Sequence, residues 1–366
     1  MRVPFHKNRG KRRREGDLTR RVLEDPDAAA DAESGERLTG KGQLTRHRTV
    51  VGSEQDEALI RETGDRETET GRVLSAVGAN HCRVQTADGL VIECTIRRVV
   101  RTLAREARNA VVAGDIVHFS RVDEHSGVIE SVDPRKTTLS RGSRQKAHII
   151  VANVDQAVIV ASAAMPDLKL PLIDRFLCST ETGGIQGIVC INKCDLVPRE
   201  RLQPIIGQYA LIGYPVVLTN ALTGEGIPEL RRLLQGHETV FTGQSGVGKT
   251  SLLNAVQPGL GRAVGEVSSD TTKGRHTTRV AELMKLDGAG WVVDTPGVRQ
   301  LQLWDVAREE VEGVFVEFRP YTARCRFPDC RHTHERGCGI KNAVTRGMIS
   351  PLRYASYVRI VTGDDD

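Results

Sequence analysis

The sequence predicts an α/β core that follows a small all-β barrel and precedes a short C-terminal domain. Residues 71–140 contain short runs of alternating apolar residues separated by Gly and Asp turns, a pattern typical of a barrel or sandwich. Residues 150–303 alternate apolar strand-like runs with amphipathic helix-like runs, as in a parallel sheet covered by helices. Residues 304–366 are rich in Cys and His and end in helix-like sequence, which indicates a third domain.

The composition of the whole chain is that of a soluble protein. Its 366 residues allow two or three domains, 39% of them are hydrophobic, 27% are charged, and the net charge is +5. No apolar run reaches the roughly 18 residues of a membrane span, and the N-terminus lacks the apolar region of a secretory signal. The clustering of cysteines near the C-terminus favours a metal site in a reducing compartment over disulfides. We therefore expect a cytoplasmic protein with no membrane partner.

The first 70 residues predict no folded domain. Residues 1–21 carry nine Lys and Arg, whereas residues 22–70 carry six against thirteen acidic residues, and aromatic residues are almost absent. Such a segment cannot bury enough apolar surface to fold alone, so we expect a disordered extension. Its KRRR run suits a nucleic-acid contact and a solvated tail about equally.

The all-β region contains five strand-like runs, which suit a five-stranded barrel of the OB type. The runs are GRVLSAVG, HCRVQTADG, LVIECTIRR, GDIVHFSRVD and SGVIESVD. An insertion, RRVVRTLAREAR, follows the third run and is either an exposed helical or loop face or a nucleic-acid contact. Its arginines are Arg97, Arg98, Arg101, Arg105 and Arg108.

The α/β region predicts a parallel sheet whose ligands bind at the carboxyl ends of the strands. The expected strands are VDQAVIVASA, GIVCINKCD, YPVVLTNA, ETVFTGQ and GWVVDTPG. The expected helices are LPLIDRFLCSTETGG, IPELRRLLQ and KTSLLNAV.

A phosphate-binding loop is predicted at GQSGVGKTS, between an expected strand and an expected helix. It matches the pattern G-x-x-x-x-G-K-[ST], in which backbone N–H groups and a helix N-terminus surround a phosphate chain. Lys249 would reach the β- and γ-phosphates, and the Thr250 hydroxyl would bind Mg²⁺. The predicted nucleotide-binding residues here are Gly243, Gln244, Ser245, Gly246, Val247, Gly248, Lys249, Thr250 and Ser251.

A guanine-reading loop is predicted at NKCD, which also follows an expected strand. The Asp195 carboxylate can accept from both the ring N–H and the exocyclic amine of guanine, a pair that adenine lacks. Asn192 would brace the loop, and the stem of Lys193 would pack on the base. The next strand ends in TNALTGEG, where Asn220 precedes the backbone N–H groups of Ala221 and Leu222 that could support the guanine carbonyl.

Switch-like segments are predicted at DTPGV and in the polar stretch VSSDTTKGRHTTR. Asp294 would hold Mg²⁺ through water, and the Gly297 N–H would meet the γ-phosphate. A threonine of the polar stretch would close on Mg²⁺. Thr277 and Thr278 are the leading candidates for this role, and Thr271 and Thr272 are weaker ones.

His276 is the candidate for orienting the attacking water. Val298 occupies the place where many GTPases carry a glutamine, and valine cannot orient water. His276 could do so from the other switch, although a solvated loop histidine is the alternative interpretation. The predicted catalytic residues are therefore His276, Thr277 and Lys249.

A structural zinc site is predicted in CRFPDCRHTHERGC. Three thiolates and one imidazole, with spacing C-x4-C-x-H-x5-C, complete a tetrahedral zinc site and leave no position for water. The predicted ligands are Cys325, Cys330, His332 and Cys338, with His334 as the alternative to His332.

The order of these motifs is unusual. NKCD and TNALTGEG precede GQSGVGKTS, whereas in an ordinary GTPase the phosphate loop comes first. Together with GRHTT, DTPGVR and the Cys/His cluster, this order resembles the circularly permuted GTPases of the RsgA (YjeQ) family, which are small ribosomal subunit biogenesis factors. The resemblance covers about residues 71–360 and implies an OB barrel, a permuted GTPase domain and a zinc domain.

The resemblance implies a GTP-hydrolysing enzyme that binds the small ribosomal subunit and its rRNA late in maturation, with release coupled to hydrolysis. It also implies GTP or GDP, Mg²⁺ and one zinc ion as ligands of the residues named above, and we expect a monomer. Asn220 departs from the family, in which this position resembles serine, but backbone donors can survive that change.

Two other functions compete with this one. A non-catalytic RNA-binding scaffold would use the nucleotide only as a structural ligand, and Val298 in place of glutamine is its best support. A metabolic kinase would also use a phosphate-binding loop, but it leaves NKCD and the Cys/His cluster unexplained.

Overall fold

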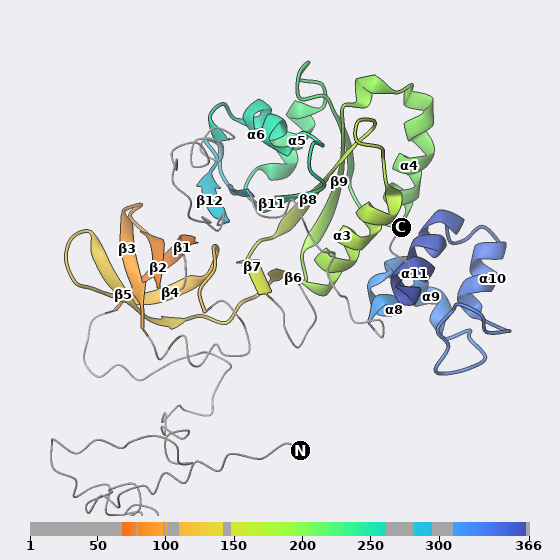
Figure 1. The fold of residues 1–366 in the computed structure, drawn as a ribbon, viewed down its shortest axis with the longest axis horizontal. Helices are drawn as coiled ribbons and strands as arrows, with labels where there is room; N and C mark the ends of the chain where they lie inside the picture. The colour runs from red at the N-terminus through yellow and green to blue at the C-terminus, as the bar shows by residue number, and fades with distance from the viewer. Residues whose placement is uncertain are drawn as a thin grey trace, which may run out of the picture. The chain divides into compact units, whose positions relative to one another are not determined.

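The computed structural model describes residues 68–77, 80–97, 100, 110–141, 148–260, 281–294 and 310–363 (Figure 1). The side chains of Arg141 and Asp294 lie outside this description. The predicted N-terminal extension lies outside the described residues except for its last three. No helix in the described part is long and apolar enough to cross a membrane.

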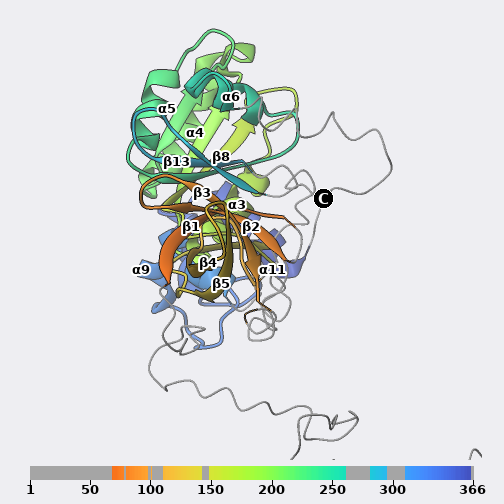
Figure 2. The same ribbon diagram turned by 90° about the vertical axis from the view of Figure 1, so that its left-hand side faces the viewer.

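The N-terminal strands form a closed five-stranded barrel (Figures 1 and 2). The strand order is β1-β2-β3-β5-β4, and β1 pairs again with β4 to close the barrel. Alternate residues of the strands point inward, so that Val84, Ile92, Phe119 and Ile129 are fully buried at its centre. The strands are β1 (Glu69–Val77), β2 (His81–Thr86), β3 (Val91–Ile96), β4 (Ile116–Arg121) and β5 (Ser126–Val132).

The central domain contains a mainly parallel sheet in the order β10-β9-β8-β11-β13, with β12 antiparallel at its end. All five parallel strands end at the same edge, which therefore gathers the loops that follow them. The strands are β8 (Gln156–Ser162), β9 (Gln186–Asn192), β10 (Val216–Thr219), β11 (Glu238–Thr242), β12 (Glu282–Lys285) and β13 (Trp291–Asp294).

Helices cover both faces of this sheet (Figure 1). On one face, Val158 and Cys190 pack with Leu230 of α5 (Ile227–Leu234) and Leu252 of α6 (Lys249–Val256). On the other face, Ile159 and Val189 pack with two further helices. These are α3 (Leu170–Thr182), through Ile173, Phe176 and Leu177, and α4 (Arg199–Leu211), through Leu202 and Tyr209.

The barrel and the central sheet are joined by backbone and side-chain bonds. Strand β1 pairs with β12, which links Ser75 to Glu282 and makes one continuous sheet. Arg72 of β1 forms an ion pair with Glu238 of β11. A separate hairpin of β6 (Thr138–Arg141) and β7 (His148–Ala152) lies between the two parts in the chain, and its Leu139 and Val151 are buried in the same cluster as Val240.

The C-terminal segment is helical and has its own core. Its elements are α8 (Val311–Val314), η6 (Val316–Phe318), α9 (Arg319–Thr322), α10 (Gly339–Thr345) and α11 (Pro351–Thr362). Phe315, Phe318, Ile340 and Tyr357 are buried together, and Cys178 of α3 belongs to the same cluster. This core contains residues of the central domain as well as of the C-terminal segment.

The predicted fold class is confirmed in its three parts. The expected strands and helices of the central domain are all present, and a β barrel precedes them. Helix α4 was not among the expected helices, because it contains Pro204 and Gly207, which both disfavour a helix in the sequence pattern. The expected C-terminal helical stretch is two helices, α10 and α11, separated by a turn at Gly347. The exact domain boundaries remain predictions.

Candidate nucleotide-binding site and metal centre

The NKCD loop leaves β9 with its asparagine buried and its aspartate exposed. Asn192 is 2% exposed, and its Nδ2 donates to the Val247 carbonyl of the predicted phosphate loop at 2.9 Å. Its Oδ1 accepts from the Thr219 hydroxyl at 3.2 Å and from the Ala221 N–H at 3.3 Å. One amide side chain therefore joins the ends of β9, β10 and β11.

Lys193 makes a second link between these loops. It adopts a left-handed conformation with φ of 57°, and its Nζ donates to the Gly246 carbonyl at 2.8 Å. The same Nζ also donates to the Met165 carbonyl in the loop that follows β8. Asp195 follows in the short helix η4 (Cys194–Leu196) and is exposed, so its carboxylate is open to a ligand.

The phosphate loop connects β11 to α6. Gly243 has φ of 140°, and a Cβ there would lie 2.1 Å from the Val160 carbonyl of β8, so only glycine allows this close approach. Lys249 Nζ donates to the carbonyls of Gly243 and Gln244 at 2.7 and 2.8 Å. The ammonium thus lies inside the loop, where it can meet the phosphates of a nucleotide.

The loop after β10 is shaped by the Asn220 side chain. Asn220 Oδ1 accepts from the N–H groups of Leu222 and Thr223 at 2.8 and 3.2 Å, and its own N–H donates to the Glu225 carbonyl at 2.9 Å. The N–H groups of Ala221 and Leu222 were both predicted to meet the guanine carbonyl. Each of them already has a hydrogen-bond acceptor inside the protein. The Ala221 bond is the longer one, so Ala221 stays the better candidate donor to a ligand.

The magnesium and switch residues are only partly described. Thr250 is exposed in the first turn of α6, and Asp294 ends β13, where its backbone lies opposite Phe241 of β11. The Asp294 side chain, His276, Thr277, Thr278, Thr271, Thr272, Gly297 and Val298 lie outside the described residues. The structure therefore brings together the base-reading and phosphate loops, and the roles of the switch residues remain predictions.

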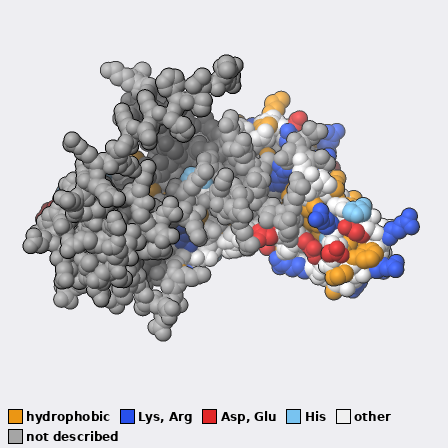
Figure 3. Space-filling view, turned by 60° about the horizontal axis from the view of Figure 1, so that its bottom comes forward, with side chains coloured by type: hydrophobic (Ala, Val, Ile, Leu, Met, Phe, Trp, Pro, Cys, Tyr) orange, Lys and Arg blue, Asp and Glu red, His pale blue; other side chains and the backbone are white. Residues whose placement is uncertain are grey.

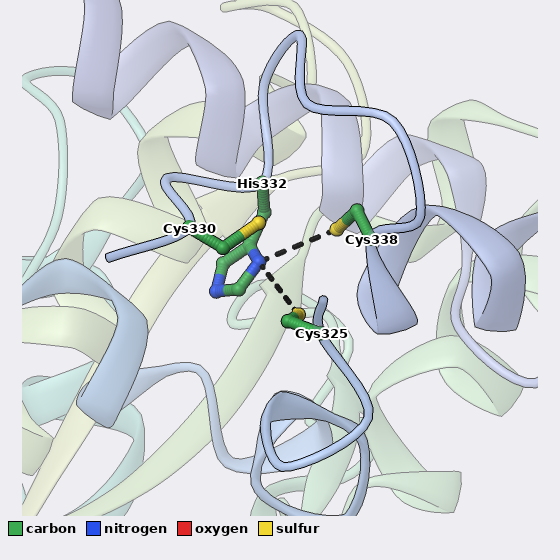
Figure 4. Close-up of side chains that lie close together, drawn as sticks. All are labelled: Cys325, Cys330, His332 and Cys338. Atoms are coloured by element: carbon green, nitrogen blue, oxygen red, sulfur yellow. Dashed lines mark hydrogen bonds between the residues drawn. The ribbon is translucent and has the colours of Figure 1, made fainter. Parts of the chain in front are cut away.

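The Cys/His cluster is compact and mostly buried (Figure 4). The ligand atoms of Cys325, Cys330, His332 and Cys338 lie within 4.8 Å of one another. His332 Nδ1 lies 3.3 Å from Cys338 Sγ and 3.5 Å from Cys325 Sγ, so this nitrogen faces the thiols. His334, the alternative ligand, is exposed and contacts the Thr333 hydroxyl.

The surroundings of the cluster suit a cation. The outer nitrogen of His332, Nε2, lies 3.2 Å from a carboxylate oxygen of Glu312 but forms no hydrogen bond with it, and a carboxylate this close could orient the imidazole once a metal is bound. Burial and the neighbouring Cys338 raise the pKa of Cys330 to about 12, so a positive ion would be needed to hold this thiol as a thiolate. Three thiolates and one imidazole form a donor set that zinc prefers.

Comparisons with known proteins agree with this geometry. Residues 132–304 match the model of the RsgA GTPase family. The chain is 40% identical over 273 residues to the small ribosomal subunit biogenesis GTPase RsgA of Alkaliphilus metalliredigens, covering 74% of this chain and 90% of that protein. The chain belongs to the RsgA GTPase family. It is therefore a GTP-hydrolysing enzyme with circularly permuted motifs.

Two solved structures share its architecture. YjeQ from Thermotoga maritima is 36% identical, with a TM-score of 0.67 over 81% of this chain and 98% of that one. YloQ, described as a circularly permuted GTPase, is 29% identical, with a TM-score of 0.63 over 83% of this chain and 97% of that one.

The RsgA fold explains how the reversed motif order still builds one pocket. Each motif ends a strand of one parallel sheet, so moving the chain termini leaves the loops at the same edge. Sequence reasoning missed the loop after β8, whose Met165 carbonyl binds Lys193. Its residues carry no recognisable motif, and only the position of β8 beside β9 could have indicated it.

Proposed function

We propose that this protein binds the small ribosomal subunit in its GTP form late in maturation, and leaves when GTP is hydrolysed. The observation that carries the proposal is the junction of the three loops by Asn192 and Lys193, in a chain of the RsgA family. Because the guanine-reading loop is hydrogen-bonded directly to the phosphate loop, recognition of the base and binding of the phosphates depend on each other. The name of the Alkaliphilus relative supports the small subunit as the partner.

The chain's own residues supply the parts of GTP hydrolysis. Asp195 would select guanine, Lys249 would neutralise the phosphates, and His276 would orient the attacking water. Mg²⁺, when bound, would help to neutralise the phosphate charge, and Thr250 at the start of α6 and Asp294 at the end of β13 would hold it. A zinc ion in the Cys/His cluster would hold the C-terminal domain in shape and take no part in the chemistry.

A basic hollow in the C-terminal domain supports RNA as part of the partner. A cavity of about 730 Å³ is lined there by four basic side chains and one acidic one, Glu335, together with Tyr321 and Met348. The basic residues of its wall are Arg324, Arg336, Lys341 and Arg346. Figure 3 shows Lys and Arg side chains at several places on the described face of the molecule, with acidic ones between them. Since phosphate contacts dominate such binding, the RNA affinity should fall steeply with salt.

One arginine of the insertion after the third barrel strand forms an ion pair within the barrel. Arg97, the first arginine of the predicted insertion, pairs with the buried carboxylate of Glu130 at 2.8 Å, so it serves the barrel itself. The other four arginines lie outside the described residues. We therefore propose the C-terminal hollow as the first RNA contact to test.

Co-sedimentation with purified small subunits tests the proposal. The protein should pellet with the subunits in the presence of a non-hydrolysable GTP analogue and stay in solution with GDP. Arg324→Ala with Arg336→Ala should weaken pelleting at fixed salt. Equal pelleting with GDP and with the GTP analogue would contradict release by hydrolysis.

The alternative of a non-catalytic scaffold, which Val298 in place of the usual glutamine favoured, is not retained, because the chain belongs to a family of GTP-hydrolysing enzymes. A monomeric state and a cytoplasmic location remain predictions from the sequence.

A further inference from the structure

A fully buried arginine connects the C-terminal domain to the central domain. Arg353 of α11 is 1% exposed, and its Nη1 donates to Asp174 Oδ1 of α3 at 2.8 Å. Its Nε and Nη2 donate to both carboxylate oxygens of Glu317 at 2.7 and 3.0 Å. The guanidinium also lies 4.4 Å from the centre of the Phe315 ring. One side chain thus holds helices α3 and α11 and the short helix η6 together.

The charge of Arg353 is retained in spite of its burial. Burial alone would lower the pKa of the guanidinium, but Asp174 and Glu317 together raise it well above its ordinary value. Both carboxylates are themselves almost fully buried. Buried ion networks contribute little net stability compared with apolar packing, and their best-attested use is to fix how elements fit together. Removal of one partner is costly, because it leaves the others buried and unpaired.

The acidic partner on α3 also contacts α4, the helix that follows the guanine reader in the chain. Asp174 Oδ1 also accepts from the hydroxyl of Tyr209 in α4 at 2.8 Å. In the chain, α3 precedes β9 and α4 follows the NKCD loop, so Asp174 joins the two helices that flank that loop. Helix α3 also begins directly after the loop whose Met165 carbonyl binds Lys193.

Residues next to Glu317 and Arg353 in the chain also contact the metal cluster. Glu317 is next to Phe318, whose ring packs edge-on against the ring of His332 at 6.2 Å between centroids. Tyr357, one turn after Arg353, donates to the Arg331 carbonyl at 2.9 Å. These contacts connect the metal cluster to α3 and α4, and Tyr209 of α4 belongs to the same buried cluster as Cys194 of the NKCD loop.

We propose that the Asp174–Arg353–Glu317 network lets the C-terminal domain hold the guanine-reading side of the nucleotide site in its binding geometry. Metal binding to the Cys/His cluster and the affinity for guanine nucleotides are then coupled. The coupling goes through α3 and α4, on the base side of the pocket. It goes beyond the proposed ribosomal function, because it concerns the isolated protein and needs no partner.

The test measures the affinity of the full-length protein for a fluorescent GDP analogue with zinc bound and after chelation. In the wild type, chelation should weaken GDP binding by about tenfold, within the usual range of coupling between sites. Reciprocity requires GDP to reduce the zinc dissociation constant by the same factor, measured with a chelating dye. In Arg353→Met, GDP binding should be weakened even with zinc present, and chelation should change it less than about twofold.

Arg359→Met is the matched control, since it makes the same change on an exposed position of the same helix. It should keep the wild-type coupling. Glu317→Gln and Asp174→Asn conserve the shape of the side chain and remove one charge each. If circular dichroism shows that Arg353→Met is not folded, the coupling between zinc and GDP binding is measured in these two variants instead. Wild-type coupling in folded Arg353→Met, or in both acid variants, would overturn the proposal. No small subunits are used, so this result is independent of the proposed ribosomal function.

Discussion

Gly248→Ala tests the junction of the base-reading and phosphate loops most sharply. Gly248 is the residue before α6, and its φ is 96°, a conformation that alanine adopts only with strain. A Cβ at this position would lie 2.4 Å from Asn192 Nδ2, the atom that donates to the Val247 carbonyl. The substitution must therefore either move the loop or push the Asn192 amide away from it.

The expected loss of GDP-binding free energy in Gly248→Ala has two contributions. The backbone strain costs about 1–2 kcal/mol, and loss of the Asn192–Val247 hydrogen bond costs about 1 kcal/mol. If the phosphate loop of the nucleotide-free variant moves to a less strained conformation, its return to the binding geometry costs this sum of about 2–3 kcal/mol. Because 1.4 kcal/mol is tenfold in affinity, GDP binding should weaken by roughly 30- to 140-fold.

The assay is titration of a fluorescent GDP analogue, with thermal unfolding of the nucleotide-free protein measured in parallel. Gly259→Ala is the matched control, since Gly259 has φ of 97° but its added Cβ would meet nothing within 4 Å. It should lower the free energy of unfolding by a similar strain energy and leave GDP affinity unchanged. A Gly248→Ala affinity within about threefold of the control would refute the reasoning.

Three further substitutions test single assignments. Asp195→Asn should raise the ATP affinity relative to that of GTP, because an amide cannot accept from both guanine donors; unchanged discrimination in a competition titration would count against the base reader. His276→Ala should slow single-turnover hydrolysis at least tenfold while GTP affinity stays within about twofold, and equal rates would remove its role. Glu312→Gln should weaken zinc binding about tenfold, because the carboxylate lies beside His332 Nε2 and would orient the imidazole when zinc is bound; a zinc dissociation constant equal to that of the wild type, measured with a chelating dye, would exclude that role.

Sequence patterns were sufficient where a segment depends mostly on its own residues. KTSLLNAV combines good helix formers with an apolar face, and GIVCIN is a short apolar run bounded by polar loops, so α6 and β9 were both predictable. The motif loops follow such strands, and the rule that ligands bind at strand carboxyl ends placed them at one edge. The four residues of the Cys/His cluster were predictable for the same reason, because they lie within fourteen positions of one another.

Patterns failed where the outcome depends on partners far away in the chain. Arg353 and Asp174 are 179 positions apart, and charged residues carry no local signal that they will be buried. The pairing of Ser75 with Glu282, which joins the barrel to the central sheet, is equally non-local. Helix α4 forms in spite of Pro204 because Leu202 and Tyr209 are buried against the sheet, so packing overrides local propensity.

We propose that the small ribosomal subunit stimulates GTP hydrolysis by this RsgA-family GTPase. The most direct measurement is steady-state GTP turnover of the full-length protein, with and without purified small subunits, at fixed magnesium and low salt. Small subunits should raise turnover at least tenfold, and Lys249→Ala should abolish this increase. Turnover that stays at the intrinsic rate when saturating subunits are added would contradict stimulation by the small subunit.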